Sequence, residues 1–227
     1  MARIREDRGS NQAFACRHRF RGKGSTIHSL ILASASPRRR QLLAGAGYRF
    51  EVDPSDVDEP EPVGPVAVED YVAALAWRKA RAVALRRGSG LILGADTACA
   101  VGGEILNKPV DRPDAERMIR LQEGREIAVV TGLCLYRADR GEWVGAAEVT
   151  TCRCRPLTDA ERSEHLDSGR WEGKAGAYGV QDDDDPFVTV VRGSWSNVVG
   201  LPLERLASLL AGYPRLTSDD GSATMVG

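Results

Sequence analysis

Two long runs with strand character constrain the fold of this chain more than any other feature. They cover residues 127–136 and 144–155, and the turn-rich segment Ala138-Asp139-Arg140-Gly141 separates them. A turn this short joins antiparallel neighbours, so the two runs predict a long β-hairpin. A hairpin needs further strands or a helix layer to bury its apolar side, and the rest of the chain must supply them.

Helical patterns and shorter strands intermix over the rest of the chain. Residues 30–33 and 91–95 are apolar runs typical of strands, and 66–87, 111–122 and 202–210 have helical character. A capping box at Thr158 and Glu161 begins a further helix, and 187–191 has strand character. Because helices and strands do not alternate strictly, the pattern predicts an α/β or α+β fold with a mixed sheet.

The two ends of the chain differ from its middle. Residues 1–28 are rich in Arg, Gly and Ser and have no periodicity, which predicts a disordered N-terminal extension. Residues 216–227 are similarly without pattern and predict a flexible tail. One folded domain over 29–215 is therefore expected.

Charge and cysteine content narrow the functional classes. Lys and Arg number 31 against 32 Asp and Glu, so no overall basic field attracts nucleic acid or a membrane surface. The chain has no apolar run of membrane-spanning length, and its five cysteines form no CxxC pair. These features predict a cytoplasmic protein without nucleic-acid or membrane partners, in which Cys152 and Cys154 are small buried residues.

Several common catalytic designs lack parts in this sequence. Of three histidines, His18 and His28 lie in the predicted extension, and His165 lies among charged residues on the capped helix, where it is expected to face solvent. A Ser-His-Asp triad and a histidine zinc site are therefore both incomplete. No segment fits GxxxxGK[ST] or GxGxxG, so P-loop and Rossmann chemistry are unsupported.

Positive charge gathers at one predicted helix start. Ser36 and Pro37 are preferred residues for an N-cap and a first helical position, and Arg38, Arg39 and Arg40 follow directly. Three arginines oppose the helix dipole, which favours negative charge there. Either a bound phosphate or nearby acidic side chains would resolve the conflict.

Two lysines are further candidate cations. Lys79 lies on the apolar stripe of the 66–87 helix, so it must either extend to solvent or face a cleft. Because the position lies on that stripe, Lys79→Met is expected to be tolerated or even stabilising in a thermal melt. Lys108, fixed by Pro109, follows a predicted hairpin at 91–106.

The candidate acids have competing interpretations. Asp96 follows the apolar run 91–95, where a carboxylate is either functional or caps a turn. Glu59 lies in an acidic loop, 53–61, that either binds a divalent cation or is solvated. The four acids at 182–185 are better explained as a hydrated loop, because adjacent side chains cannot all face one ion.

In their order and wording these segments resemble the Maf family of nucleoside triphosphate pyrophosphatases. Two loops of small residues, 174–181 and 193–202, complete the resemblance, which spans about 30–210 and neither terminus. The other motifs that carry it are Leu32-Ala33-Ser34-Ala35-Ser36-Pro37-Arg38-Arg39, Gly94-Ala95-Asp96-Thr97, Lys108-Pro109 and Thr131-Gly132. The resemblance implies an elongated α/β mixed-sheet fold of the Maf and inosine-triphosphatase type, with two lobes around a deep cleft.

The resemblance also implies an activity and a set of roles. The family hydrolyses a nucleoside triphosphate to monophosphate and pyrophosphate with a divalent metal, Mg²⁺ or Mn²⁺, and is usually a homodimer. Asp96 would be the general base or a metal-bound carboxylate, with Glu59 assisting at the metal. The phosphates would be held by Arg38, Lys79 and Lys108, with Ser36 and Arg39 as further contacts.

The wording of two motifs is closer to one branch of the family. Residues 174–181 and Asp96-Thr97 resemble the branch that prefers dTTP and UTP, in which Arg38, Thr97 and Gln181 would bear on specificity. Asp182 departs from the usual pattern and puts the path of Gln181 in doubt. Two other functions stay open at this point: a nucleotide-binding regulator of cell division with little turnover, and a nucleic-acid binder using residues 1–28.

Overall fold

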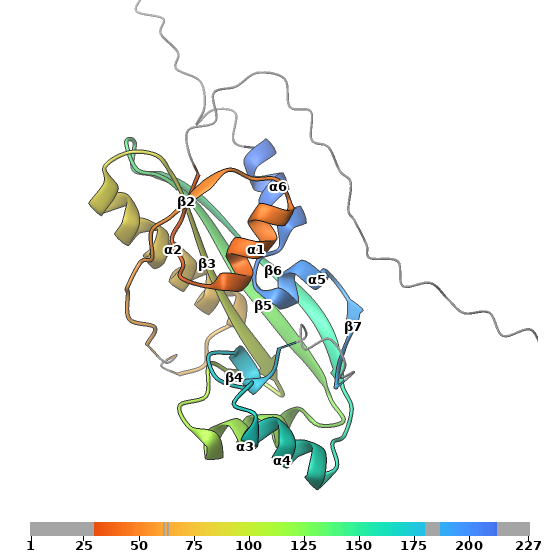
Figure 1. Cartoon of the computed structure of the whole chain (residues 1–227). Helices are drawn as coiled ribbons and strands as arrows, with labels where there is room; N and C mark the ends of the chain where they lie inside the picture. Colours follow the sequence, from red (N-terminus) through yellow and green to blue (C-terminus); the bar gives the residue numbers. More distant parts are fainter. Residues whose placement is uncertain (1–29, 61, 63, 180–186, 213–227) are drawn as a thin grey trace, which may run out of the picture.

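The computed structural model describes residues 30–60, 62, 64–179 and 187–212 and shows one mixed sheet in an elongated molecule (Figure 1). The strand order is β2-β1-β3-β5-β6-β7, with β4 paired to β3. Strand β1 pairs in parallel with β2 and β3, and every other pairing among the described strands is antiparallel. The strands are β1 (Leu30–Leu32), β2 (Phe50–Val52), β3 (Leu91–Val101), β4 (Glu104–Leu106), β5 (Glu126–Arg137), β6 (Glu142–Cys154) and β7 (Val188–Arg192).

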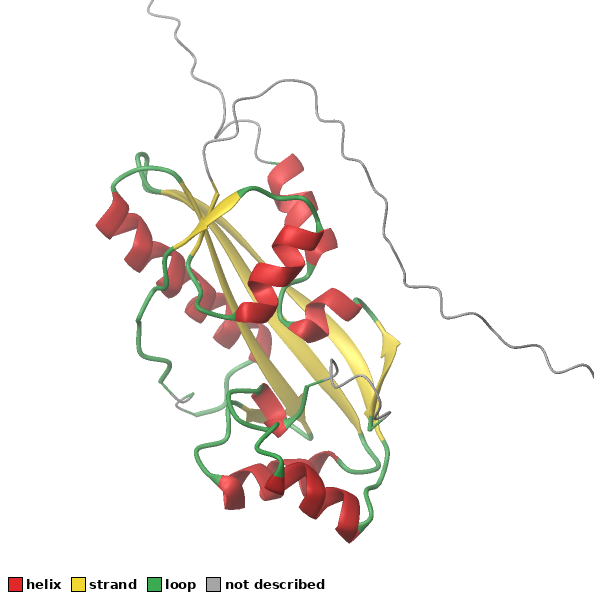
Figure 2. Cartoon of the chain, in the orientation of Figure 1, coloured by secondary structure: helices red, strands yellow, loops and turns green. Residues whose placement is uncertain are grey.

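Helices cover both faces of the sheet and the end of the sheet that carries β4 (Figure 2). One long helix, α2, packs on β3 and β5 on one face, whereas α1, α5 and α6 lie on the other. The pair α3 and α4 closes the end of the molecule that carries β4. The helices are α1 (Pro37–Gly45), α2 (Val68–Arg87), α3 (Arg112–Gln122), α4 (Asp159–Asp167), the 3-10 helix η1 (Ala175–Ala177), α5 (Trp195–Val199) and α6 (Leu203–Ala211).

The long strands β3 and β5 contribute to hydrophobic clusters on both faces and at both ends of the sheet. At one end, alternate residues of β1 and β3 point to opposite faces, so Leu32 and Leu93 pack toward α1 and α6 while Ile31 and Ile92 pack toward α2. At the other end, a core around the fully buried Phe187 joins β3, β5 and β6 to α3 and α4. The mixed α/β sheet expected from the sequence is confirmed.

Two glycines allow α2 to lie directly on the sheet. A Cβ on Gly94 of β3 would stand 2.1 Å from the backbone oxygen of Ala76, and one on Gly132 of β5 would stand 2.3 Å from that of Val72. Any side chain at these positions would therefore push the helix away. This close approach carries Lys79, the inward-facing lysine of α2, to the strand that bears Asp96.

The hairpin and the capping box are confirmed, but one strand is longer than its apolar run. The hairpin is β5 and β6, and Thr158 and Glu161 form the capping box of α4. The apolar run 91–95 predicts a strand that ends at Asp96-Thr97, whereas β3 continues to Val101 because β5 supplies hydrogen-bond partners as far as Ala100. Asp96 is therefore a mid-strand residue.

Other features of the described chain bear on the sequence predictions. Cys152 and Cys154 are buried, as expected. Burial raises the pKa of Cys154 to about 12, so its thiol is neutral and inert. Within the described residues, no helix has the length and apolar character needed to cross a membrane. The predicted extension 1–28 and tail 216–227 lie outside the described residues.

Candidate active site

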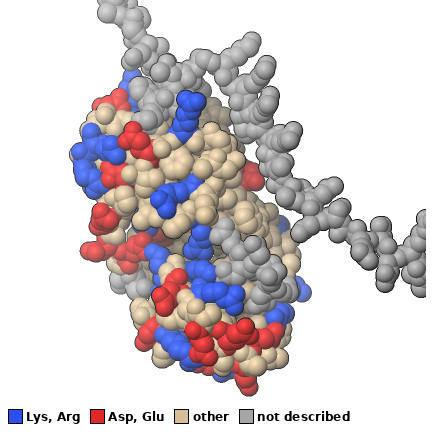
Figure 3. Space-filling model, viewed as in Figure 1, with Lys and Arg blue, Asp and Glu red and all other residues tan. Residues whose placement is uncertain are grey.

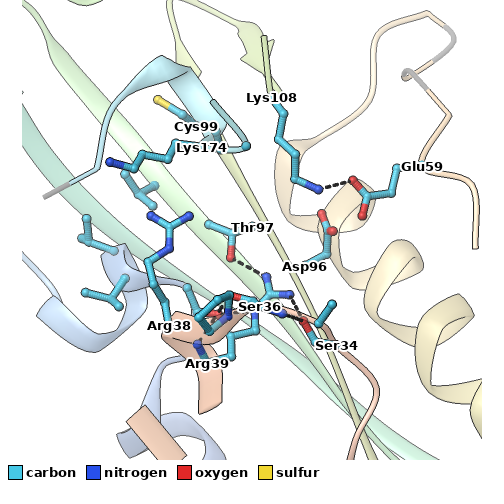
Figure 4. A pocket seen from close by; sticks show the side chains of 18 of the residues that line it. Ser34, Ser36, Arg38, Arg39, Glu59, Asp96, Thr97, Cys99, Lys108 and Lys174 are labelled. Atoms are coloured by element: carbon cyan, nitrogen blue, oxygen red, sulfur yellow. Dashed lines mark hydrogen bonds and ion pairs between the residues drawn. The ribbon is translucent and has the colours of Figure 1, made fainter. Parts of the chain in front are cut away.

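A cavity of about 700 Å³ opens between the two ends of the sheet. In the space-filling view, Lys and Arg atoms are visible in the middle of the elongated molecule (Figure 3). Every candidate site residue in the described chain lines it, and Gln181 lies outside the described residues. The candidates that meet there are Lys79 and the residues labelled in Figure 4, namely Ser36, Arg38, Arg39, Glu59, Asp96, Thr97 and Lys108.

One end of the cavity, called the charged end below, is lined by Arg38, Arg39, Glu59, Lys79, Asp96 and Lys108. A buried ion pair lies at its centre. Lys79 Nζ donates to Asp96 Oδ1 at 2.5 Å and to Glu59 Oε1 at 2.6 Å. The side chains of Lys79 and Asp96 are only 7% and 8% exposed. Lys79 therefore faces the cavity and does not extend to bulk solvent, and Asp96 pairs with a cation instead of capping a turn.

Glu59 bridges two lysines from different elements. Its second oxygen, Oε2, accepts from Lys108 Nζ at 2.8 Å, so Lys108, Glu59, Lys79 and Asp96 form a chain of alternating charge. Partial burial favours the neutral acid, but the hydrogen bonds from Lys108 and Lys79 outweigh it and lower the pKa of Glu59 to about 2. Glu59 is thus a carboxylate at neutral pH.

The start of α1 places an arginine across the site. Ser36 caps the helix by accepting from Arg39 N at 3.5 Å, and Pro37 is its first residue. The Arg39 guanidinium donates to Gly200 O at 2.8 Å and to the hydroxyls of Ser34 and Thr97, both at 3.1 Å (Figure 4). All three acceptors are neutral oxygens.

The charge of Arg39 has consequences for an anionic ligand. Burial lowers the pKa of Arg39, which the carboxylates of Asp96 and Glu59 oppose, and a guanidinium stays charged at neutral pH. Because its hydrogen bonds go to neutral groups, its positive charge is available to a bound anion. The arginines at the start of α1 oppose the helix dipole, and either nearby acidic side chains or a bound phosphate would offset their charge. This geometry favours the phosphate.

Hydroxyl groups join this arginine to the last loop of the domain. Thr97 Oγ1 lies 2.9 Å from Thr131 Oγ1, which donates to the backbone oxygen of Asn197 at 3.2 Å. The buried Asn197 side chain donates in turn to Val129 O and Thr150 Oγ1, both at 2.9 Å. The motifs 131–132 and 193–202 therefore meet through side chains, a contact that sequence spacing alone does not reveal.

The opposite end of the cavity is lined mainly by apolar side chains, to which the segment before η1 adds Glu172 and Lys174. Its walls come from β3, β5, β7, α3, α5 and the loop around η1. The wall residues include Cys99, Gln122, Ile127, Val129, Tyr178, Val188 and Val198. Only Tyr178 and Val198 lie in motifs that the sequence analysis selects, the loops 174–181 and 193–202, because the others belong to patterns that also fit a closed core.

The expectation that His165 faces solvent is wrong. His165 is 5% exposed, and its Nε2 lies 3.0 Å from the backbone oxygen of Ala177. Its ring also packs on Tyr178, with centroids 5.0 Å apart. The charged neighbours Glu161 and Glu164 misled the prediction, since they occupy other positions around α4 while the His165 face packs against the η1 loop.

The two carboxylates are the candidate metal ligands. Among the described residues, no group of three or more His, Cys, Asp or Glu side chains is placed to hold an ion. Asp96 and Glu59 nevertheless converge on one lysine nitrogen, so their oxygens lie close together at the cavity wall. Mg²⁺ commonly takes one or two protein carboxylates and completes its shell with water and substrate phosphates, and this pair fits that pattern.

The fold and this site together define a class of protein. Basic groups line one end of a deep cavity and apolar side chains line the other, with a buried carboxylate among the cations. This arrangement suits an elongated ligand with an anionic end and a flat apolar end. The protein is therefore an α/β protein with a cavity suited to a phosphorylated ligand.

Comparison with known proteins gives the family. The family model described as Maf-like protein matches residues 29–213. A dTTP/UTP pyrophosphatase of Rhodopirellula baltica is 48% identical over 85% of this chain and 86% of its own length. Another dTTP/UTP pyrophosphatase, from Symbiobacterium thermophilum, is 42% identical over 86% of this chain and all of its own. The chain belongs to the Maf family.

One solved structure gives a weaker likeness. It is a nucleoside-triphosphatase / dITP/XTP pyrophosphatase from Mycobacterium abscessus, with a TM-score of 0.35 at 17% identity. The match covers 63% of this chain and 95% of that one. A score this low does not by itself establish a shared fold.

Proposed function

We propose that this protein is a nucleoside triphosphate pyrophosphatase that hydrolyses dTTP and UTP to the monophosphate and pyrophosphate. One observation carries the proposal: Asp96, a buried carboxylate in the middle of β3, faces a cavity among Lys79, Arg39 and Lys108. Phosphoryl transfer asks mainly for placement and charge neutralisation, which these groups supply. The names of the relatives at 42–48% identity support the same reaction.

The cations hold the triphosphate at the charged end of the cavity. Arg38 and Arg39 lie at the N-terminus of α1, where the positive end of the helix dipole adds to the attraction for phosphate. Lys79 comes from α2 and Lys108 from the segment after β4, and both line the same cavity. Binding therefore requires phosphate oxygens to compete with Glu59 for the two lysines.

Asp96 acts on the water that attacks the nucleotide. Within the described chain its Oδ1 accepts from Lys79, which leaves Oδ2 to take the water proton. The water oxygen bonds to the α-phosphorus, the bond from that phosphorus to the α,β-bridging oxygen breaks, and pyrophosphate leaves with the electron pair. Arg39 and the lysines stabilise the charge that develops on the phosphate oxygens.

A divalent cation, Mg²⁺ or Mn²⁺, completes this proposal. When bound by Asp96 and Glu59 it would neutralise phosphate charge and orient the triphosphate. The support is the convergence of the two carboxylates on Lys79 Nζ. Removing divalent cations with a chelator should stop turnover, and adding back Mg²⁺ or Mn²⁺ should restore it.

The choice of pyrimidine triphosphates rests on the base end of the cavity and on the named relatives. A carboxamide such as that of Gln181 can pair with both the donor and the acceptor edge of uracil or thymine. Thr97, on the cavity wall, and Arg38 are the other proposed specificity residues. Rejected bases would leave buried polar groups unpaired, which costs a few kcal/mol, on the order of 1–3 per group.

Location and assembly belong to the same proposal. We place the enzyme in the cytoplasm, where nucleoside triphosphates are its substrates, as a homodimer without nucleic-acid or membrane partners. Light scattering coupled to size-exclusion chromatography measures the assembly directly. A monomer at micromolar concentration would contradict the dimer and leave the reaction unaffected.

A nucleotide panel tests the function. Pyrophosphate release is measured with dTTP, UTP, CTP, ATP, GTP and 7-methyl-GTP at equal concentration, with Asp96→Asn as the control that ties activity to this site. We expect dTTP and UTP to be hydrolysed fastest. A clear preference for a purine would overturn the substrate assignment alone, whereas tight binding without turnover would favour the regulator of cell division.

A further inference from the structure

Two buried side chains from outside the charged end hold the loop that forms one wall of the cavity. Gln122, at the end of α3, donates from Nε2 to Gly176 O at 2.6 Å and to Met118 O at 2.9 Å. His165, on α4, contacts the next carbonyl of the loop, Ala177 O, at 3.0 Å. Two successive backbone oxygens of η1 are thus each bound by a side chain from a different helix.

The acceptors fix the orientation of both side chains. A backbone carbonyl oxygen only accepts hydrogen bonds, so His165 must carry its proton on Nε2. Gln122 faces two carbonyls with the same end of its amide, so that end must be the NH₂ group. Its oxygen then faces the Cys99 thiol, 3.6 Å away. Both groups are at most 5% exposed, so water does not replace these bonds easily.

The held loop has a conformation that it would not adopt freely. Gly176 and Ala177 have φ of 68° and 61°, and the left-handed region is disfavoured for alanine. A Cβ on Gly176 would stand 3.1 Å from Cys99 Cβ and 3.2 Å from Gln122 Oε1, so the loop also packs tightly. Such backbone persists only where its surroundings determine it. Gln122 and His165 hold this backbone conformation through their hydrogen bonds to Gly176 O and Ala177 O.

The loop connects to both ends of the cavity. Tyr178 follows it directly, lines the apolar end, and has its ring between His165 at 5.0 Å and Phe187 at 4.8 Å. On the other side, Gly176 N donates at 3.0 Å to the backbone oxygen of Asn107, the residue before Lys108. A shift of the loop would move the Tyr178 wall first, because the Lys108 side chain lies beyond a flexible stem.

We propose that Gln122 and His165 are positioning residues that hold the 175–178 loop as a wall of the base end, and so determine how tightly and selectively the nucleotide base is bound. Among the described residues, neither side chain forms a hydrogen bond or ion pair with Asp96 or with Arg39, Lys79 or Lys108, so the bond-breaking step does not depend on them. The inference rests on the proposed function for its substrate, but the loop geometry stands on its own contacts.

Three variants and one control test the proposal. Phenylalanine in His165→Phe keeps a ring against Tyr178 and removes the donor, and Gln122→Leu removes the amide at similar volume. Glutamine in His165→Gln places an NH₂ group near the original Nε2 and should rescue. Thr158→Ala, which removes the cap of α4 without touching the loop, is the control for general destabilisation.

The measurements separate positioning from mere stability. We expect His165→Phe and Gln122→Leu to raise KM for UTP by about 3- to 10-fold, the effect of one lost buried hydrogen bond, while kcat stays within about 2-fold. The ratio of kcat/KM for UTP over GTP should fall, and amides of 175–178 should exchange hydrogen faster. His165→Gln should return toward wild type, and Thr158→Ala should change none of these readouts.

The outcomes distinguish a failure of this positioning role from a failure of the proposed pyrophosphatase function. Unchanged KM, selectivity and loop exchange in both folded variants would overturn it, as would equal changes in Thr158→Ala. If Gln122→Leu fails to fold, Gln122→Met replaces it. If His165→Phe fails to fold, His165→Gln is compared with His165→Asn, whose shorter side chain holds its amide too close to the backbone to reach the loop. If the wild type releases no pyrophosphate, the proposed function fails, and loop exchange alone decides the positioning role.

Discussion

The two ends of the cavity are built by different physical means. At the charged end, side chains from α1, α2, β3 and the 53–60 loop reach into the space and neutralise one another, as in the chain from Lys108 through Glu59 and Lys79 to Asp96. At the apolar end, the wall is partly backbone, and two buried polar side chains hold it: Gln122, which also lines the cavity, and His165 behind it. The first end has charges that a ligand can rearrange, and the second has a shape that a ligand must fit.

This contrast predicts that chemistry and selectivity can be altered separately. Changes to Asp96, Lys79 or Glu59 at the charged end should lower kcat or stability and leave the order of nucleotide preference intact. Changes behind the apolar end should alter KM and preference and leave kcat intact. The following variants test that separation.

Asp96→Asn should have the largest effect. The change removes the proton acceptor at almost constant volume, so kcat should fall by about 10²-fold or more, while nucleotide binding persists. Pyrophosphate release measures the loss, and calorimetry with a UTP analogue bearing an α,β-imido bridge measures binding. Glu104→Gln, the same chemical change on β4 outside this cavity, is the matched control. Near-normal turnover in purified Asp96→Asn would remove Asp96 from the mechanism.

Lys79→Met should destabilise the fold as well as impair turnover. The substitution leaves Asp96, 8% exposed, without its cation, and breaking a buried pair in this way costs about 3 kcal/mol. The apolar stripe of α2 by itself gave the opposite expectation, that methionine would be tolerated. Chemical denaturation at neutral pH measures the change. The double variant Lys79→Met/Asp96→Asn should recover most of it, and additive losses would show that the pair is not coupled.

Gly132→Ala should act on the charged end through packing alone. The added Cβ meets backbone atoms of Val72, so α2 must shift, at a cost of about 1–3 kcal/mol. Since α2 carries Lys79, kcat should fall while the UTP over GTP preference is kept. Gly45→Ala, where a new Cβ meets no atom within 4 Å, is the control and should melt as the wild type does. A change of preference in Gly132→Ala would contradict the separation of the two ends.

The smallest effect concerns acid stability. The pKa of Glu59 is lowered from 4.5 to about 2, so its ionised form stabilises the fold above pH 4.5 and this contribution is lost as pH falls toward 2. Because the side chain is 34% exposed, the contribution should stay below about 1 kcal/mol. In Glu59→Gln the free energy of unfolding should fall less steeply between pH 4.5 and 2. An unchanged slope would mean that the bridge to the lysines adds nothing to stability.

Local patterns in the sequence determined most of the elements and the charged residues of the site. The cap at Ser36, the capping box at Thr158 and the 127–155 hairpin depend on neighbours in the chain, so they could be predicted without the fold. Lys79 was singled out by a conflict between its charge and its position on an apolar stripe. The small-residue loops and motif order then indicated the family, which the match over 29–213 shows.

Only the tertiary structure decided what those residues meet and what stands behind them. The continuation of β3 beyond Thr97 depends on its pairing with β5, and the burial of His165 depends on the packing of α4 against η1. Gln122 reaches Gly176 across 54 positions of the chain. Helical and strand periodicity report which face of an element is apolar, whereas a buried polar contact is fixed by which elements pack together. For that reason the sequence determined the charged end, and the fold determined the shape of the other.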